Sequence, residues 1–289
     1  MISLDPKEEK TARIHAIMLG AIAPRPIALA STLGENGIPN LSPFSFYNCF
    51  GAKPPILIFS PARRVRDNTT KHTLQNIMIN SEVVINAVNY EMVNQISLAS
   101  SEFLEGVNEF EKAGLTAIPS VLVKPFRVKE SPVQFECRVK EVIATGTEGG
   151  AGNLVICEIV MIHVKESILN EAGKIDPYKI DLVARMGDDW YCRANGDSLF
   201  EVEKPHSKIG IGVDSIPKEI RNSPILTGND LGKLGNVESL PTREEIEKYK
   251  ADFNSSSLFL QDEKQRHEFA KNLLTLGKAE EAWKVLLSK

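Results

Sequence analysis

Positively charged and hydroxyl side chains are concentrated in one short stretch of the chain, residues 60–73. It contains three arginines, one lysine and four hydroxyl residues: Arg63, Arg64, Arg66, Lys71, Ser60, Thr69, Thr70 and Thr73. Guanidinium groups bind phosphate oxygens through paired hydrogen bonds, and a lysine adds a point charge. A strand-like run precedes the stretch and a helical pattern follows it, so N–H groups at a helix start would face the same anion. These residues predict a site for a phosphate monoester; a solvated basic loop is the alternative that they leave open.

Two further residues are candidates for a role in catalysis, His163 and Arg185. Simple alternation places His163 on one strand face with Val155 and Cys157, which favours a core or interface histidine over a position beside a nicotinamide. Arg185 suits a structural anchor and a substrate contact equally. The sequence has no Ser/His/Asp order, no HExxH motif and no paired catalytic carboxylates, and its four cysteines lie far apart. We therefore expect neither a hydrolase nor a metalloenzyme, and no metal site.

Composition and charge are those of an ordinary globular protein. The 289 residues are 42% hydrophobic and 25% charged, and the formal net charge is −4. Without a basic excess, no general nucleic-acid surface is expected. The N-terminal segment lacks the apolar core of a signal peptide, and no apolar run reaches the ~20 residues that span a bilayer. We expect a cytoplasmic protein that binds neither nucleic acid nor membrane.

Short apolar runs separated by Gly, Pro and Asn turns fill the first two thirds of the chain, which is typical of an antiparallel β protein. Strands are predicted at residues 26–32, 56–60, 82–88, 133–140 and 154–164, and helices at 70–80 and 92–99. Both faces of 154–164 are apolar, so this strand needs cover from a helix or from a second subunit. The Gly-rich segment 145–153 lacks a P-loop pattern and is interpreted as a hairpin turn.

The sequence pattern changes near residue 205. A capping box at Thr242–Glu245 opens a charged helix, and residues 263–287 predict one or two amphipathic helices with Gly277 between them. We therefore divide the chain into a β-barrel-like domain, residues 1–205, and a mainly helical C-terminal extension, residues 206–289. Residues 222–236 are loop-like; they would form a lid over the site or, in the preferred interpretation, pack on their own subunit.

Ordered motifs between about residues 15 and 195 carry a family resemblance. They are PRPIALAST (24–32), GIPNLSPFSFYN (37–48), KPPILIFS (53–60), KHTLQNI (71–77), GNLVICEIVMIHV (152–164) and RMGDDWY (185–191). Together they resemble the flavin reductase-like family, although His72 and Asp188 stand where the family usually has Asp and Gly. The resemblance implies a mainly β fold, an FMN-binding split β-barrel with a few short helices, with the helical extension outside the family core.

The resemblance also implies roles for individual residues. Ser31 and Thr32 would face the flavin; Ser45, Phe46 and Asn48 would line its ring edge; Arg64, Lys71 and Thr73 would take the phosphate, with Ser60 and Arg66 as lesser candidates. Hydride transfer from a nicotinamide to a flavin needs no protein nucleophile, so no catalytic residue is assigned.

The function that the resemblance implies is that of an NAD(P)H-dependent FMN reductase. Members of this type are usually homodimers, and some supply reduced flavin to a monooxygenase partner. Two alternatives stay open: a non-catalytic FMN-binding protein that acts as a sensor or store, and an FMN-dependent oxidoreductase that retains flavin as a prosthetic group.

Overall fold

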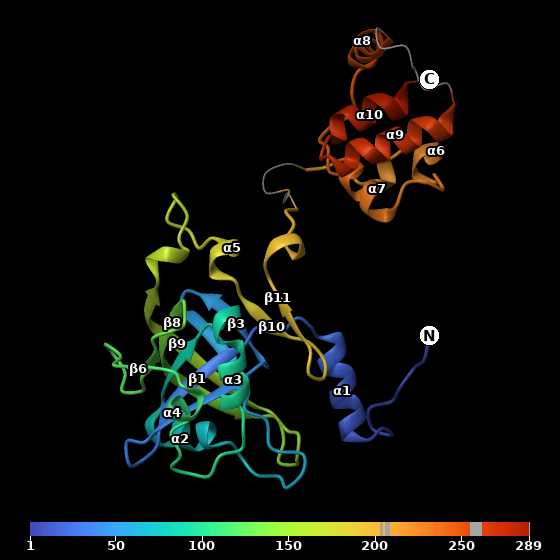
Figure 1. Cartoon of the computed structure of the whole chain (residues 1–289). Coiled ribbons are helices and arrows are strands. Elements are labelled where there is room, and N and C mark those ends of the chain that lie inside the picture. The colour runs from blue at the N-terminus through green and yellow to red at the C-terminus, as the bar shows by residue number, and fades with distance from the viewer. Residues whose placement is uncertain (203–204, 206–208, 255–261, 289) are drawn as a thin grey trace. The chain divides into compact units, whose positions relative to one another are not determined.

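The computed structural model consists of two compact units, Met1–Phe200 and Glu201–Lys289 (Figure 1). It describes residues 1–202, 205, 209–254 and 262–288, without the side chains of 253 and 254. Each unit has an apolar core of its own. The division falls close to the change of sequence pattern at residue 205.

All strands of the described residues lie in the first unit. They are β1 (Ala28–Leu33), β2 (Pro39–Phe44), β3 (Tyr47–Ala52), β4 (Pro55–Phe59), β5 (Glu82–Asn86), β6 (Ala117–Ile118), β7 (Arg127–Val128), β8 (Val133–Ala144), β9 (Asn153–Val164), β10 (Val183–Arg185) and β11 (Tyr191–Arg193). Its helices are α1 (Thr11–Ala21), α2 (His72–Asn80), α3 (Val93–Ala99), α4 (Glu109–Ala113) and α5 (Pro177–Ile180), with 3₁₀ turns at Tyr90–Met92, Glu166–Ile168 and Gly196–Ser198.

Among the described residues, seven strands form one antiparallel sheet in the order β2-β1-β5-β8-β9-β4-β3. The middle of the sheet is covered on both faces. Along β1, Ala28 and Ala30 face one core cluster, whereas Leu29 faces a second cluster that includes Ile96 of α3 and Phe110 of α4. Because successive strand residues point to opposite faces, all of these side chains are buried.

The five predicted strands and both predicted helices of this unit are confirmed within a few residues. The Gly-rich segment 145–153 is a hairpin turn, since it joins the antiparallel pair β8 and β9. Strand β2 was missed because Pro39 and Pro43 suggest a turn. Proline is tolerated in β2 because this strand lies at the sheet edge, where the missing N–H breaks no central ladder.

A β-bulge in β9 decides where His163 points. Cys137 pairs with Ile159 and Glu136 pairs with Met161, so β9 holds one extra residue between these pairs. The alternation therefore changes face, and the prediction that His163 shares a face with the buried residues in the first half of β9 is wrong. Its Nε2 instead lies 2.7 Å from Oε1 of the fully buried Glu136. A bulge leaves no mark in a pattern of alternating hydrophobicity.

The second unit is helical. Its elements are α6 (Lys218–Arg221), α7 (Gly228–Gly235), α8 (Arg243–Asn254), α9 (Glu263–Thr275) and α10 (Ala279–Leu287), with a 3₁₀ turn at Val213–Ser215. The predicted capping box is present, because the Glu245 amide donates to the Thr242 hydroxyl at 3.3 Å and the Thr242 amide donates to Glu245 Oε2 at 2.7 Å. Gly277 separates α9 from α10 with φ of +76°, a conformation that suits glycine.

Residues 222–236 are not the loop-like segment that their sequence suggests, because they contain α7. Leu226 and Leu234 belong to the apolar core of the second unit. The buried Trp283 donates from its indole Nε1 to the carbonyl oxygen of Leu234 at 3.0 Å. The segment thus packs in its own unit. In the described part of the chain, no helix has both the length and the apolar character that crossing a membrane would need.

Candidate functional site

The basic segment connects the end of β4 to the start of α2, and its conformation is held by its own polar groups. The Arg63 side chain donates from Nε to Asn68 Oδ1 at 2.6 Å and from Nη2 to the Asn68 carbonyl at 2.7 Å. Asn68 has a positive φ of 57°, which asparagine tolerates better than most residues. The Asn68 side chain in turn donates to the carbonyl of Thr147. The segment is therefore tied to the β8–β9 turn.

The glycines of the β8–β9 turn allow it to lie directly against this segment. The amide of Gly150 donates to the Arg63 carbonyl at 3.0 Å, and the Arg63 amide donates to the carbonyl of Ala151 at 2.8 Å. A Cβ on Gly149 would lie only 3.0 Å from the carbonyl oxygen of Arg64, so a larger residue would push the two backbones apart. The glycine-rich turn thus packs against the basic segment and stabilises its conformation.

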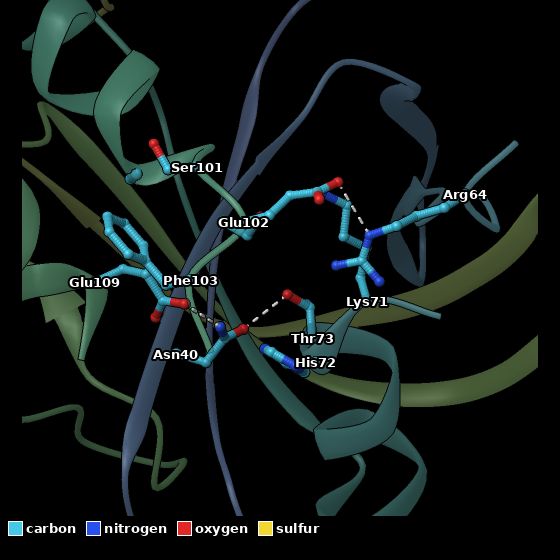
Figure 2. A pocket seen from close by; sticks show the side chains of 11 residues that line it. Asn40, Arg64, Lys71, His72, Thr73, Ser101, Glu102, Phe103 and Glu109 are labelled. Carbon is cyan, nitrogen blue, oxygen red and sulfur yellow. Dashed lines mark hydrogen bonds and ion pairs between the residues drawn. The ribbon is translucent and has the colours of Figure 1, made fainter. Parts of the chain in front are cut away.

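Three of the predicted phosphate ligands line one solvent-open pocket. Arg64, Lys71 and Thr73 are joined there by residues of β2 and of the segments around α3 and α4 (Figure 2). The remaining lining residues are Asn40, Ser42, His72, Ala99, Ser101, Glu102, Phe103 and Glu109. Arg64 is oriented by its own segment, because its Nη1 donates to Thr69 Oγ1 at 2.7 Å and to the Thr70 carbonyl at 2.9 Å.

The positive end of α2 meets this pocket. Lys71 is the N-cap residue, and its side chain makes no capping hydrogen bond, so the first N–H groups of α2 are not capped by that side chain. Burial, together with the nearby Arg64 guanidinium, lowers the pKa of the Lys71 ammonium. A helix start and two cations facing the same space attract an anion. This donor set fits the phosphate group of FMN.

A buried polar network forms one wall of the pocket and was missed by sequence analysis. Asn40 Nδ2 donates to Glu109 Oε1 at 2.9 Å, and Glu109 Oε2 accepts from the amide of Leu41 at 3.0 Å. Asn40 Oδ1 accepts from the hydroxyls of Thr73 at 2.8 Å and Thr32 at 3.3 Å. Burial raises the pKa of the Glu109 carboxyl. The network fixes α4 and the start of α2 to the edge strand β2.

The predicted ring-edge residues lie in and after the β2–β3 turn. Ser45 accepts from Arg25 Nε at 3.3 Å, and the Phe46 carbonyl accepts from the amide of Ser60. Arg25, which is 5% exposed, also donates to the carbonyls of Ile22 and Met186. Asn48 is exposed on β3, where its Oδ1 accepts from the next amide. None of these side chains lines the pocket of Figure 2.

Four other candidate residues have buried side chains: Ser31, Thr32, Ser60 and Thr73. The Ser60 hydroxyl accepts from the Asn153 amide at 3.0 Å and so holds the start of β9. Thr32 and Thr73 belong to the buried network already described. The Ser31 hydroxyl is fully buried and has no hydrogen-bond partner among the described residues. The flavin contacts of all ten candidate residues stay predictions.

Arg185 acts as an anchor within the described structure. Its guanidinium stacks over the Tyr191 ring, 4.6 Å from the ring centroid, and donates to the carbonyl of Asp188. Its backbone also pairs with that of Arg25. The side-chain contacts lie within the β10–β11 hairpin, and the backbone pairing connects this hairpin to the residues before β1.

Glu102 and Glu109 had no signal in the sequence, because they lie 36 or more positions from the arginines or amides that they contact and belong to no motif. Glu102 accepts from Arg66 Nη2 at 2.8 Å and from Arg64 Nε at 3.2 Å. The hydrogen bond from Arg66 is the main reason why the pKa of Glu102 is lowered. Asn40, by contrast, lies within the family motif GIPNLSPFSFYN (37–48).

Comparison with known proteins identifies the family and the fold of this chain. The model of the flavin reductase like domain matches residues 19–178. A protein of Aquifex aeolicus is 35% identical over 196 residues, which is 68% of this chain and 97% of that protein. The structure of nitrilotriacetate monooxygenase component B from Bacillus cereus is similar with a TM-score of 0.65 at 27% identity, over 70% of this chain and 98% of that one.

A split-barrel protein from Shewanella frigidimarina is similar with a TM-score of 0.59 at 26% identity, over 71% of this chain and its own full length. The large antiparallel sheet is therefore the split β-barrel that the sequence motifs predict. These proteins are covered almost completely, whereas part of this chain has no counterpart in them. The matched residues include the basic segment, β1 to β9 and the start of α2, and the chain belongs to the flavin reductase-like family.

Proposed function

We propose that the protein is an NAD(P)H-dependent FMN reductase whose phosphate-binding site is the pocket between α2 and the segment after α3. The observation that carries this proposal is the convergence of Arg64, Lys71 and the uncapped start of α2 in a chain of the flavin reductase-like family. The cations of this pocket form one cluster, which suits the one phosphate group of FMN. Bound FMN would supply an isoalloxazine ring that accepts a hydride from a reduced nicotinamide.

The residues of the chain would bind and orient the cofactor. Arg64 is pre-oriented by Thr69 and Thr70, so little conformational entropy is lost when its fork meets phosphate oxygens. The buried network around Asn40 holds the start of α2 in place. We place the flavin ring toward Ser45, Phe46 and Asn48, in line with the family resemblance.

We further propose that the protein works as a homodimer. The face of β9 that carries Leu154 and Ile156 is only half-buried by the described part of this chain. Helix α1 has no buried residues, although Ile17 and Met18 are apolar and more than two fifths exposed. A second copy would cover such surfaces, as homodimer interfaces generally do.

A monooxygenase that consumes the reduced flavin is the partner we propose, supported by the likeness to component B of nitrilotriacetate monooxygenase. The second unit supports a different candidate, a protein that retains its FMN as a sensor or prosthetic group, since residues beyond 178 lie outside the family match. Oxidation of NADH and NADPH, measured with and without added FMN and followed by ultrafiltration, separates the two. Turnover that rises with FMN, with flavin in the filtrate, supports the reductase; tightly held FMN without turnover contradicts it.

The phosphate assignment has its own test. Lys71→Met keeps the length of the side chain and removes its charge, and should weaken FMN by roughly tenfold while riboflavin, which has no phosphate, changes little. Lys140→Ala, at an exposed lysine of β8, is the matched control. Equal losses for FMN and riboflavin in Lys71→Met would refute the assignment.

A further inference from the structure

A carboxylate lies between the two arginines at the mouth of the pocket. Glu102 belongs to the segment that joins α3 to α4, and each of its oxygens contacts a different guanidinium. Oε1 is 3.2 Å from Arg64 Nε, and Oε2 is 2.8 Å from Arg66 Nη2. Figure 2 shows the Glu102 side chain directed toward Arg64 and Lys71. An anion therefore already occupies the space between the arginines.

A phosphate group in the proposed site would bind Arg64 and Lys71, so it would compete with Glu102 for the Arg64 guanidinium. Arg64 keeps its orientation without Glu102, because Thr69 and Thr70 hold its Nη1. A carboxylate and a phosphate that both lie at hydrogen-bond distance from the Arg64 guanidinium would repel each other strongly. The carboxylate must therefore leave when a phosphate arrives, while the arginine stays.

The contacts of Glu102 allow such a displacement. The Glu102 side chain is 48% exposed and that of Arg66 is 70% exposed, and ion pairs with this exposure contribute little to stability. The second carboxylate of the pocket behaves differently. Glu109 is 5% exposed and accepts two hydrogen bonds from Asn40 and Leu41. Of these two carboxylates, Glu102 is the one that can move into solvent.

We propose that Glu102 is an internal competitor for the phosphate of the flavin, so that its carboxylate sets how strongly the pocket prefers phosphorylated over unphosphorylated flavin. This inference rests on the proposed phosphate site. In the ligand-free protein the carboxylate pairs with both Arg64 and Arg66; on binding, the phosphate replaces it at Arg64 and the carboxylate turns to solvent. No covalent step is involved.

The test is the substitution Glu102→Gln, which keeps the shape of the side chain and removes its charge. Glu105→Gln is the matched control, because Glu105 is an exposed glutamate of the same segment. Equilibrium dialysis of the full chain with FMN and with riboflavin measures both affinities. We expect Glu102→Gln to bind FMN about three- to tenfold more tightly, with riboflavin within about twofold of wild type and Glu105→Gln close to wild type for both flavins.

Three results would overturn the inference: unchanged or weaker FMN binding by Glu102→Gln, an equal gain for riboflavin, or an equal gain in Glu105→Gln. Lys71→Met, measured in parallel, separates this failure from failure of the phosphate site. If Lys71→Met loses FMN selectively but Glu102→Gln gains nothing, the phosphate site stands and the competition is wrong. If Lys71→Met affects both flavins equally, the phosphate site and the competition fall together.

Discussion

Replacing Glu109 with alanine should lower the free energy of unfolding of the first unit by about 2–4 kcal/mol. The carboxylate accepts from Asn40 Nδ2 at 2.9 Å and from the Leu41 amide at 3.0 Å, and all three residues are at least 90% buried. Each hydrogen bond to a charged group contributes roughly 1.5–3 kcal/mol, and alanine leaves both donors without this acceptor. Relief from burying a carboxylate offsets part of the loss, which gives the lower net figure.

Differential scanning calorimetry measures this effect, and the two units are expected to give separate transitions. For a unit of this size, 2–4 kcal/mol corresponds to a fall in Tm of roughly 4–16 °C. Glu111→Ala, at an exposed position of the same helix, is the control and should change stability by about 0.5 kcal/mol or less. If Glu109→Ala costs no more than Glu111→Ala, the carboxylate does not anchor α4 to β2.

The raised pKa of Glu109 also predicts that the stability of the first unit depends on pH. Burial raises the pKa of Glu109 above its unfolded value of about 4.3. The folded unit therefore binds a proton at the Glu109 carboxyl more tightly than the unfolded chain does. The contribution of this proton to the free energy of unfolding is complete below about pH 4.3 and is lost as the pH rises through the raised pKa. The difference in stability between wild type and Glu109→Ala should grow on acidification from pH 8 to about 5. A difference that shrinks over this range would contradict the reasoning.

Two further predictions concern Lys71 and the second unit. Because the pKa of Lys71 is lowered, FMN affinity should begin to fall at a pH below the ordinary lysine pKa of about 10.4, whereas Lys71→Arg, which stays charged, should keep its affinity. Equilibrium dialysis between pH 7 and 10, with riboflavin as reference, checks this. An equal decline of FMN affinity in wild type and in Lys71→Arg would contradict it. A chain that ends at Phe200 should fold, and its FMN affinity should be within about twofold of that of the full protein, because the first unit has its own apolar cores. Circular dichroism measures the folding and equilibrium dialysis measures the affinity. An unfolded product would show that the first unit needs the second.

Much of the fold could be predicted because it depends on local patterns. The alternation at residues 133–140 and the apolar run at 154–164 predict β8 and β9, and the capping box at Thr242 predicts the start of α8. Residues 222–236 show the limit of such reasoning: their glycines and asparagines suggest a loop, yet packing of Leu234 in the second core stabilises α7. Tertiary burial outweighed weak helix propensity there.

The candidate site divides in the same way. Arg64, Lys71 and Thr73 lie within ten positions of one another where a strand leads into a helix, so the sequence by itself determined that they lie close together, and its motifs determined the family. Their role as phosphate ligands stays a prediction. The bulge that turns His163 toward Glu136, and the positions of Glu102 and Glu109 across the pocket, were decided only by the tertiary structure. These contacts join residues far apart in the chain, and their partners are chosen by strand register and packing, which no local pattern of residue types records.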